Sequence, residues 1–235
     1  MDIYVNLELE EPINFQDVII KSPSISEVIR YGTEEYNRLL LPYIVSLDSL
    51  GVECTDEAKE GIKNFDIVCS NENMKNLLLE SLKYFCETES IVEVGEGFKI
   101  NDKLVLNRDN FDEFGGIILE INSRQKPKVE KPPVFKNDRQ KDIWMKIQEG
   151  RKRGEKASEL KLEDIINFCE FGGRYHIPTT EIKTWTMWKL MNCYKSIVNM
   201  SKYSDNFSVC LANGDISPIE GQHWTDLLRV KHSSE

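Results

Sequence analysis

The strongest constraint on the fold is an abrupt change of composition at residues 123–136, SRQKPKVEKPPVFK. This stretch has three prolines and five basic residues but few apolar ones, a composition that favours a solvated, semi-stiff linker. The charge also changes there, since residues 1–122 carry 25 acidic and 10 basic side chains, whereas residues 123–235 carry 15 acidic and 20 basic ones. The change of sign predicts two folding units with different partners, at residues 1–122 and 137–235.

The first unit is expected to be a small mixed α/β domain with short strands. Apolar and polar residues alternate over residues 3–10, which predicts a half-buried strand. The β-branched stretch at residues 15–21 predicts a second strand that pairs with the first. Ser24 and Glu27 have the spacing of a capping box, so a short helix is expected to begin immediately after Ser24.

More helices and a small sheet are expected to complete this unit. Gly32 ends the first helix, and Pro42 predicts a kink or a boundary in the second. A longer helix capped by Asn71 or Asn73 precedes three strand-like runs, and a helix at residues 109–122 contains two adjacent glycines that each cost about 1 kcal/mol relative to alanine. The expected core face of the second helix is Tyr36, Leu39, Leu40, Tyr43 and Ile44, and the runs are Ile91–Val94, Phe98–Ile100 and Leu104–Leu106.

The second unit is expected to be mostly helical. A basic helix is predicted at residues 137–156, and a second helix ends at the glycine pair of residues 172–173. A third is predicted to start at residues 178–181 and to run to Val198, with its tryptophans in the core, before a short helix near residues 205–213. The predicted fold class is therefore α+β, with an acidic mixed domain, a Pro/Lys-rich linker and a basic helical domain.

Motifs that would indicate catalysis or cofactor binding are absent from the sequence. It contains no G-x-x-x-x-G-K-[ST], G-x-G-x-x-G, H-E-x-x-H or G-x-S-x-G pattern. The three histidines are too dispersed for a metal site, and the six cysteines form no C-x-x-C pair, so reduced structural thiols are expected. No apolar run reaches the ~18 residues of a membrane span, and the N-terminus lacks a signal-peptide pattern. We therefore expect a cytoplasmic protein that is not an enzyme and has no cofactor, no metal site and no membrane partner.

A local excess of positive charge indicates a partner-binding surface. Residues 124–161 hold 13 Lys or Arg against 6 Asp or Glu, and Arg151, Lys152 and Arg153 form a continuous basic run. These three residues, together with Trp224 in the tail, are the candidate partner-binding residues. Interspersed acids and the net charge of −10 make nucleic acid a less favoured partner than an acidic protein. A simply solvated helix face is the other interpretation.

Several segments occur in a distinctive order. They are the extended VIIKSP, the sequence ISEVIRYGTEEYNRLL at residues 25–40, the basic linker, and LEDIINFCEFGGRYHIPTTEIKTWTMWKL at residues 162–190. NCYKSIVNMSKYSDNF and the closing HWTDLL at residues 223–228 follow. By order and spacing, over about two thirds of the chain, this resembles the tail assembly chaperones of siphovirus-type phages and prophages of low-GC Gram-positive bacteria.

The resemblance implies a non-catalytic factor of the host cytoplasm that is absent from the mature virion. Such proteins bind the long helical tape-measure protein, keep it soluble and recruit tail-tube subunits, so both tail proteins are the implied partners. In related systems the two halves occur as a short form and a frameshifted long form, with the linker as the natural junction. Self-association into a homo-oligomer stays open. The alternative function is a phage or plasmid DNA-binding or regulatory protein that uses the basic helix at residues 137–156.

Overall fold

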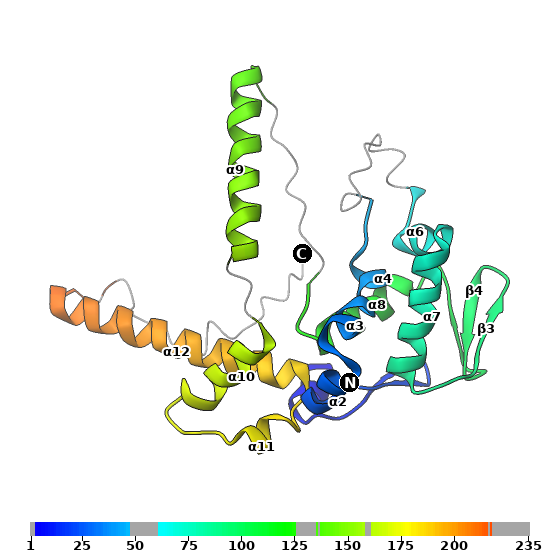
Figure 1. The fold of residues 1–235 in the computed structure, drawn as a ribbon, viewed down its shortest axis with the longest axis horizontal. Coiled ribbons are helices and arrows are strands. Elements are labelled where there is room, and N and C mark those ends of the chain that lie inside the picture. The colour runs from blue at the N-terminus through cyan, green and yellow to red at the C-terminus, as the bar shows by residue number, and fades with distance from the viewer. Residues whose placement is uncertain are drawn as a thin grey trace.

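The computed structural model describes residues 3–47, 61–125, 135, 137–157, 161–215 and 217. Within them the chain has an α+β fold that combines helices with two small antiparallel sheets (Figure 1). The elements of the first part are α1 (Ile3–Glu8), β1 (Ile13–Phe15), β2 (Val18–Ile20), α2 (Ile25–Tyr31), α3 (Thr33–Arg38), α4 (Leu41–Ile44), α6 (Asn64–Ser70), α7 (Glu72–Cys86), β3 (Ile91–Val94), β4 (Gly97–Ile100), β5 (Leu104–Leu106) and α8 (Phe111–Ile121). Those of the second part are α9 (Asp138–Ala157), α10 (Leu162–Phe171), α11 (Thr179–Ile182) and α12 (Met187–Asn213).

The main hydrophobic core is built by the first part, where α3, α4, α7 and α8 pack with both sheets. The expected core face of α3 and α4 is confirmed, because Leu39 and Leu40 are each 1% exposed and two tyrosines beside them are also buried. The hydroxyl of Tyr43 lies 3.0 Å from the hydroxyl of Ser81, and both side chains are buried. This pairing satisfies polar groups that would otherwise be costly in an apolar core.

Local signals in the sequence place most boundaries of this part correctly. The Ser24 side chain accepts a hydrogen bond from the Glu27 backbone N–H, and the Glu27 carboxylate accepts one from the Ser24 backbone N–H, which confirms the capping box. Gly32 ends α2 with φ of 99°, a conformation that favours glycine. Asn71 caps α7 by accepting from the Met74 backbone N–H. The three strand-like runs pair antiparallel in the order β3-β4-β5.

The predicted strand at residues 3–10 is wrong, because this segment forms the helix α1. Of its four alternating apolar residues only Leu7 is buried, whereas Val5 and Leu9 are 50% and 66% exposed. Ile3 and Leu7 are four residues apart, a separation that puts two side chains on the same face of a strand and also on the same face of a helix. The short pattern therefore fits either structure. Packing of α1 against β1 and α12 selects the helix. The pairing partner of β2 is consequently β1, in a hairpin with a two-residue turn.

The predicted third helix of the second part is also wrong in its boundaries. The chain leaves the helical conformation after α11, and Thr186 then caps α12 by accepting from the Lys189 backbone N–H at 3.2 Å. The predicted short helix near residues 205–213 is instead the end of α12, which is continuous for 27 residues. Trp185 is buried as expected, next to the break, and packs in a second hydrophobic core.

The two parts of the chain contact one another directly. Ile25 of α2 is fully buried in the second core, among residues of α10, α11 and α12. Its backbone N–H donates to the Trp185 carbonyl at 2.8 Å, and Ser24 and Thr186 form an antiparallel bridge. Lys189 Nζ on α12 lies 2.5 Å from Glu10 Oε1. Most of the predicted linker, residues 126–134 and 136, lies outside the described residues, so the domain boundary there stays a prediction.

Candidate protein-interaction surface

Helix α9 stands apart from both cores (Figure 1). Among its described side chains, at residues 139–147 and 149–151, none is buried. Ile143, Met145 and Ile147 are 49%, 47% and 50% exposed, and Trp144 is half-buried with its ring 5.8 Å from that of Phe135. The helix therefore presents large apolar side chains that belong to neither hydrophobic core.

This exposure matters because an isolated helix gains little stability from its own backbone. Most of the stability of a protein helix comes from packing an amphipathic face. Ile143 and Ile147 are four residues apart, so they lie on one face, and Trp144 adjoins them. The stripe formed by Ile143, Trp144 and Ile147 has the spacing of a face that docks onto another helix.

The distal half of α12 provides a second exposed surface. The proximal half is anchored by Leu190 and Ile197, which are buried. Beyond Met200 the helix projects away from the body (Figure 1), and Phe207 and Leu211 are 41% and 57% exposed. These two residues are four apart and thus share a face. Sequence reasoning missed this surface because it treated residues 205–213 as a separate short helix.

The candidate residues from the sequence lie partly within this region. Arg151 is exposed in the last part of α9, on the same helix as the apolar stripe. The backbones of Lys152 and Arg153 continue α9, but their side chains lie outside the described residues, as does all of Trp224. Helix α9 as a whole has seven basic and four acidic residues, with the basic run near its C-terminus, where cations complement the helix dipole.

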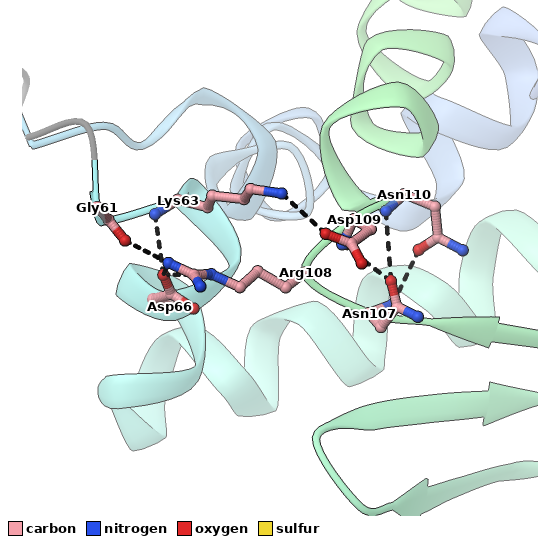
Figure 2. Close-up of polar contacts among 7 residues, drawn as sticks. All are labelled: Gly61, Lys63, Asp66, Asn107, Arg108, Asp109 and Asn110. Atoms are coloured by element: carbon pink, nitrogen blue, oxygen red, sulfur yellow. Dashed lines mark hydrogen bonds and ion pairs between the residues drawn. The ribbon is translucent and has the colours of Figure 1, made fainter.

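A cluster of polar side chains joins α6 to the turn before α8, as Figure 2 shows. Arg108 Nε donates to Asp66 Oδ2 at 3.0 Å, and Lys63 Nζ donates to Asp109 Oδ1 at 2.9 Å. The second contact lowers the pKa of Asp109. Asn107 Oδ1 accepts from the Asp109 backbone N–H at 2.9 Å, which shapes the turn. Because these charges are paired, the cluster holds two elements together and does not present an activated acid or base.

A groove of about 530 Å³ lies beside that cluster. Four of its five charged side chains form ion pairs, since Lys75 Nζ lies 2.8 Å from the Glu93 carboxylate and Arg108 pairs with Asp66. Burial raises the pKa of the Cys69 thiol, which makes that thiol a poorer nucleophile. In the part of the chain that the structure describes, no group of three or more His, Cys, Asp or Glu could hold a metal ion.

None of the helices within the described ranges is long and apolar enough to cross a membrane. No protein-family model, curated protein or solved structure matches the chain.

Proposed function

We propose that the chain is a non-catalytic tail assembly chaperone of a siphovirus-type phage or prophage, which binds the tape-measure protein and helps recruit tail-tube subunits. The observation that carries the proposal is α9, a 20-residue helix that contributes none of its described side chains to a core and exposes an apolar stripe. The order of segments that resembles this family supplies the identity of the partner. The proposed location is the host cytoplasm, with the protein absent from the mature virion.

The chemistry of α9 suits a long helical partner. An amphipathic helix binds by laying its apolar face against a complementary apolar surface. In such interfaces the apolar centre supplies most of the affinity, while charges at the rim steer the approach and select the partner. The apolar stripe of α9 and the basic run at its end would provide these two parts, and they favour a partner with an apolar stripe flanked by acidic residues.

DNA binding is the alternative function, and it makes a different demand on α9. Phosphate contacts require basic side chains but no exposed apolar stripe, so the apolar residues of α9 distinguish the two functions.

The replacement of Ile143 and Ile147 by serine should abolish capture of the tape-measure protein in a co-expression pull-down, because it removes the apolar stripe. Val92→Ser, at a 57% exposed position of β3, is the control. Unchanged capture by the double serine variant would refute α9 as the binding surface, and tight, salt-sensitive binding to duplex DNA would favour the alternative.

The basic run should act mainly on the rate of association. Replacement of Arg151, Lys152 and Arg153 by glutamate should slow association with the tape-measure protein by about tenfold or more at low salt, because steering by charge raises association rates. The difference should shrink as salt screens the charges. Binding kinetics at two salt concentrations measure this, and thermal melts check folding.

A matched control keeps the change in net charge constant. Arg30, Lys103 and Arg174 are exposed and lie outside α9 and the distal half of α12. Their joint replacement by glutamate should leave the association rate close to that of the unmodified chain. Equal slowing by both triple variants would mean that only net charge matters, and unchanged kinetics of the first variant would mean that its basic run is a solvated helix face.

A further inference from the structure

Two cysteines meet where α10 packs against α12. Cys169 on α10 is fully buried in the second core, and Cys193 on α12 is half-buried at its margin. The Cys169 sulfur lies 3.7 Å from the backbone carbonyl oxygen of Leu190, which is one helical turn before Cys193. Both cysteines pack in the same hydrophobic cluster, where each thiol shifts the pKa of the other. The sequence separates them by 24 positions and gives no sign of the pair, since neither belongs to a C-x-x-C motif.

The surroundings make the two thiols unequal. The interaction with the Cys169 thiol lowers the pKa of Cys193, and the ammonium group of Lys189, one turn earlier on α12, lowers it further. The same pairing raises the pKa of Cys169, as does its burial. The Lys189 ammonium forms an ion pair with Glu10 and also lies 5.3 Å from the centre of the Trp185 ring. Cys193 is thus both the more exposed thiol and the one that ionises more readily, which are the properties of a reactive cysteine.

We propose that Cys193 and Cys169 form a redox-sensitive pair that closes to an intramolecular disulfide when the protein meets hydrogen peroxide. This inference is independent of the proposed function. The Cys193 thiolate attacks one oxygen of the peroxide, so that an S–O bond forms, the O–O bond breaks, and the departing hydroxide takes up the thiol proton as water. The Cys169 sulfur then attacks the sulfenic sulfur, so that the S–S bond forms and the hydroxyl leaves with the Cys169 proton as a second water. Two thiols lose two electrons, and one peroxide becomes two waters.

The disulfide would fasten α10 to the anchored half of α12. Since α12 continues into the exposed distal half, the bond would fix the base of that projecting helix. It would also close a loop that contains α11 and the break before α12, which restricts the unfolded chain. The oxidised protein should therefore melt at a higher temperature than the reduced protein.

Peptide mapping tests the pairing directly. The full chain is treated with a small excess of hydrogen peroxide, alkylated, and digested with trypsin without reduction. We expect a cross-linked species of residues 162–174 and 190–195, with a mass about 2 Da below the sum of the two peptides because two hydrogens are lost. Cys210→Ser, which alters another half-buried cysteine of α12, should leave this product unchanged. A folded, peroxide-treated chain that yields both peptides alkylated and not cross-linked would overturn the proposal.

A second variant separates the roles of the two thiols. In Cys169→Ser, the sulfenic acid at Cys193 has no partner, so dimedone should trap it at Cys193 in preference to Cys210. Preferential labelling of Cys210 would mean that Cys193 is not the reactive thiol and would also overturn the proposal. If this variant does not fold, the peptide map of the unmodified chain still decides the question.

Discussion

Two neighbouring leucines mark the boundary between core and surface. Leu40 is 1% exposed, whereas Leu41, the first residue of α4, is 44% exposed. Because both residues are leucines and only their burial differs, a comparison of the two isolates the contribution of core packing to the free energy of unfolding. The sequence predicted the burial of Leu40 from the helical spacing of residues 36–44, because that pattern is local and strong.

Replacement of Leu40 by alanine should lower the free energy of unfolding by about 2–5 kcal/mol, the range for a buried leucine that leaves a cavity. The same change at Leu41 should cost less than about 1 kcal/mol, as is usual for an exposed position. Urea denaturation of both variants measures the difference. Equal losses in the two variants would contradict the burial of Leu40.

At the scale of elements, the two adjacent glycines of α8 have different roles. A Cβ atom on Gly115 would lie 3.0 Å from Cδ1 of Tyr43, a buried ring of α4. A Cβ atom on Gly116 would meet nothing within 4 Å. Gly115 therefore permits the close approach of α4 and α8, while Gly116 lies on the exposed side of the helix. The sequence predicted the same cost for both, since helix propensity does not register a neighbouring element.

Opposite effects on stability are expected from alanine at these two positions. Gly116→Ala should raise the free energy of unfolding by about 0.5–1 kcal/mol through helix propensity alone. Gly115→Ala should lower it, because overpacking costs about 1–3 kcal/mol and exceeds that gain. Thermal or urea denaturation of the two variants provides the measurement. A stabilising Gly115→Ala would show that α4 moves aside without cost.

At the scale of the whole molecule, the two parts share a boundary held by backbone and side chains. The bond from the Ile25 N–H to the Trp185 carbonyl and the ion pair between Glu10 and Lys189 connect segments that are far apart in the sequence. Half-buried side chains of α10 and α12, including Met187, also pack on the main core. The change in charge between the halves predicts two parts, and it contains no information on how closely they pack.

Limited proteolysis should cut first within residues 123–136, where proline and charge oppose regular structure and where basic residues provide trypsin sites. The two fragments should then elute together in gel filtration, because the contacts between the parts do not depend on the intervening segment. Mass spectrometry of the first products identifies the cut. A first cut within the described helices or strands would contradict the domain boundary predicted at residues 123–136. Separate elution of the fragments would mean that the contacts between the two parts are too weak to hold them together.

The fold was more predictable from the sequence than the candidate site. Capping residues such as Ser24 and Asn71 act over three or four positions, so their helices could be placed from local patterns. The nature of α1 depends on packing against α12, which no local pattern contains. The basic residues of α9 were visible as a charge excess, but the exposure of Ile143 and Phe207 depends on what the rest of the chain leaves uncovered. The contact between Cys169 and Cys193 likewise arises only when two helices pack.

The burial of Ile25 has a consequence for any shorter product of the same reading frame. A chain that stopped within residues 123–136 would keep α2 and its capping box but would lack every helix that covers Ile25. Its apolar side chain, and the neighbouring backbone N–H groups that pair with Lys183 and Trp185, would face water. Such a fragment would be complementary to the surface of α10, α11 and α12 in a separately produced second part. The ratio of fragment to second part would then set what fraction of the fragments kept Ile25 exposed to water.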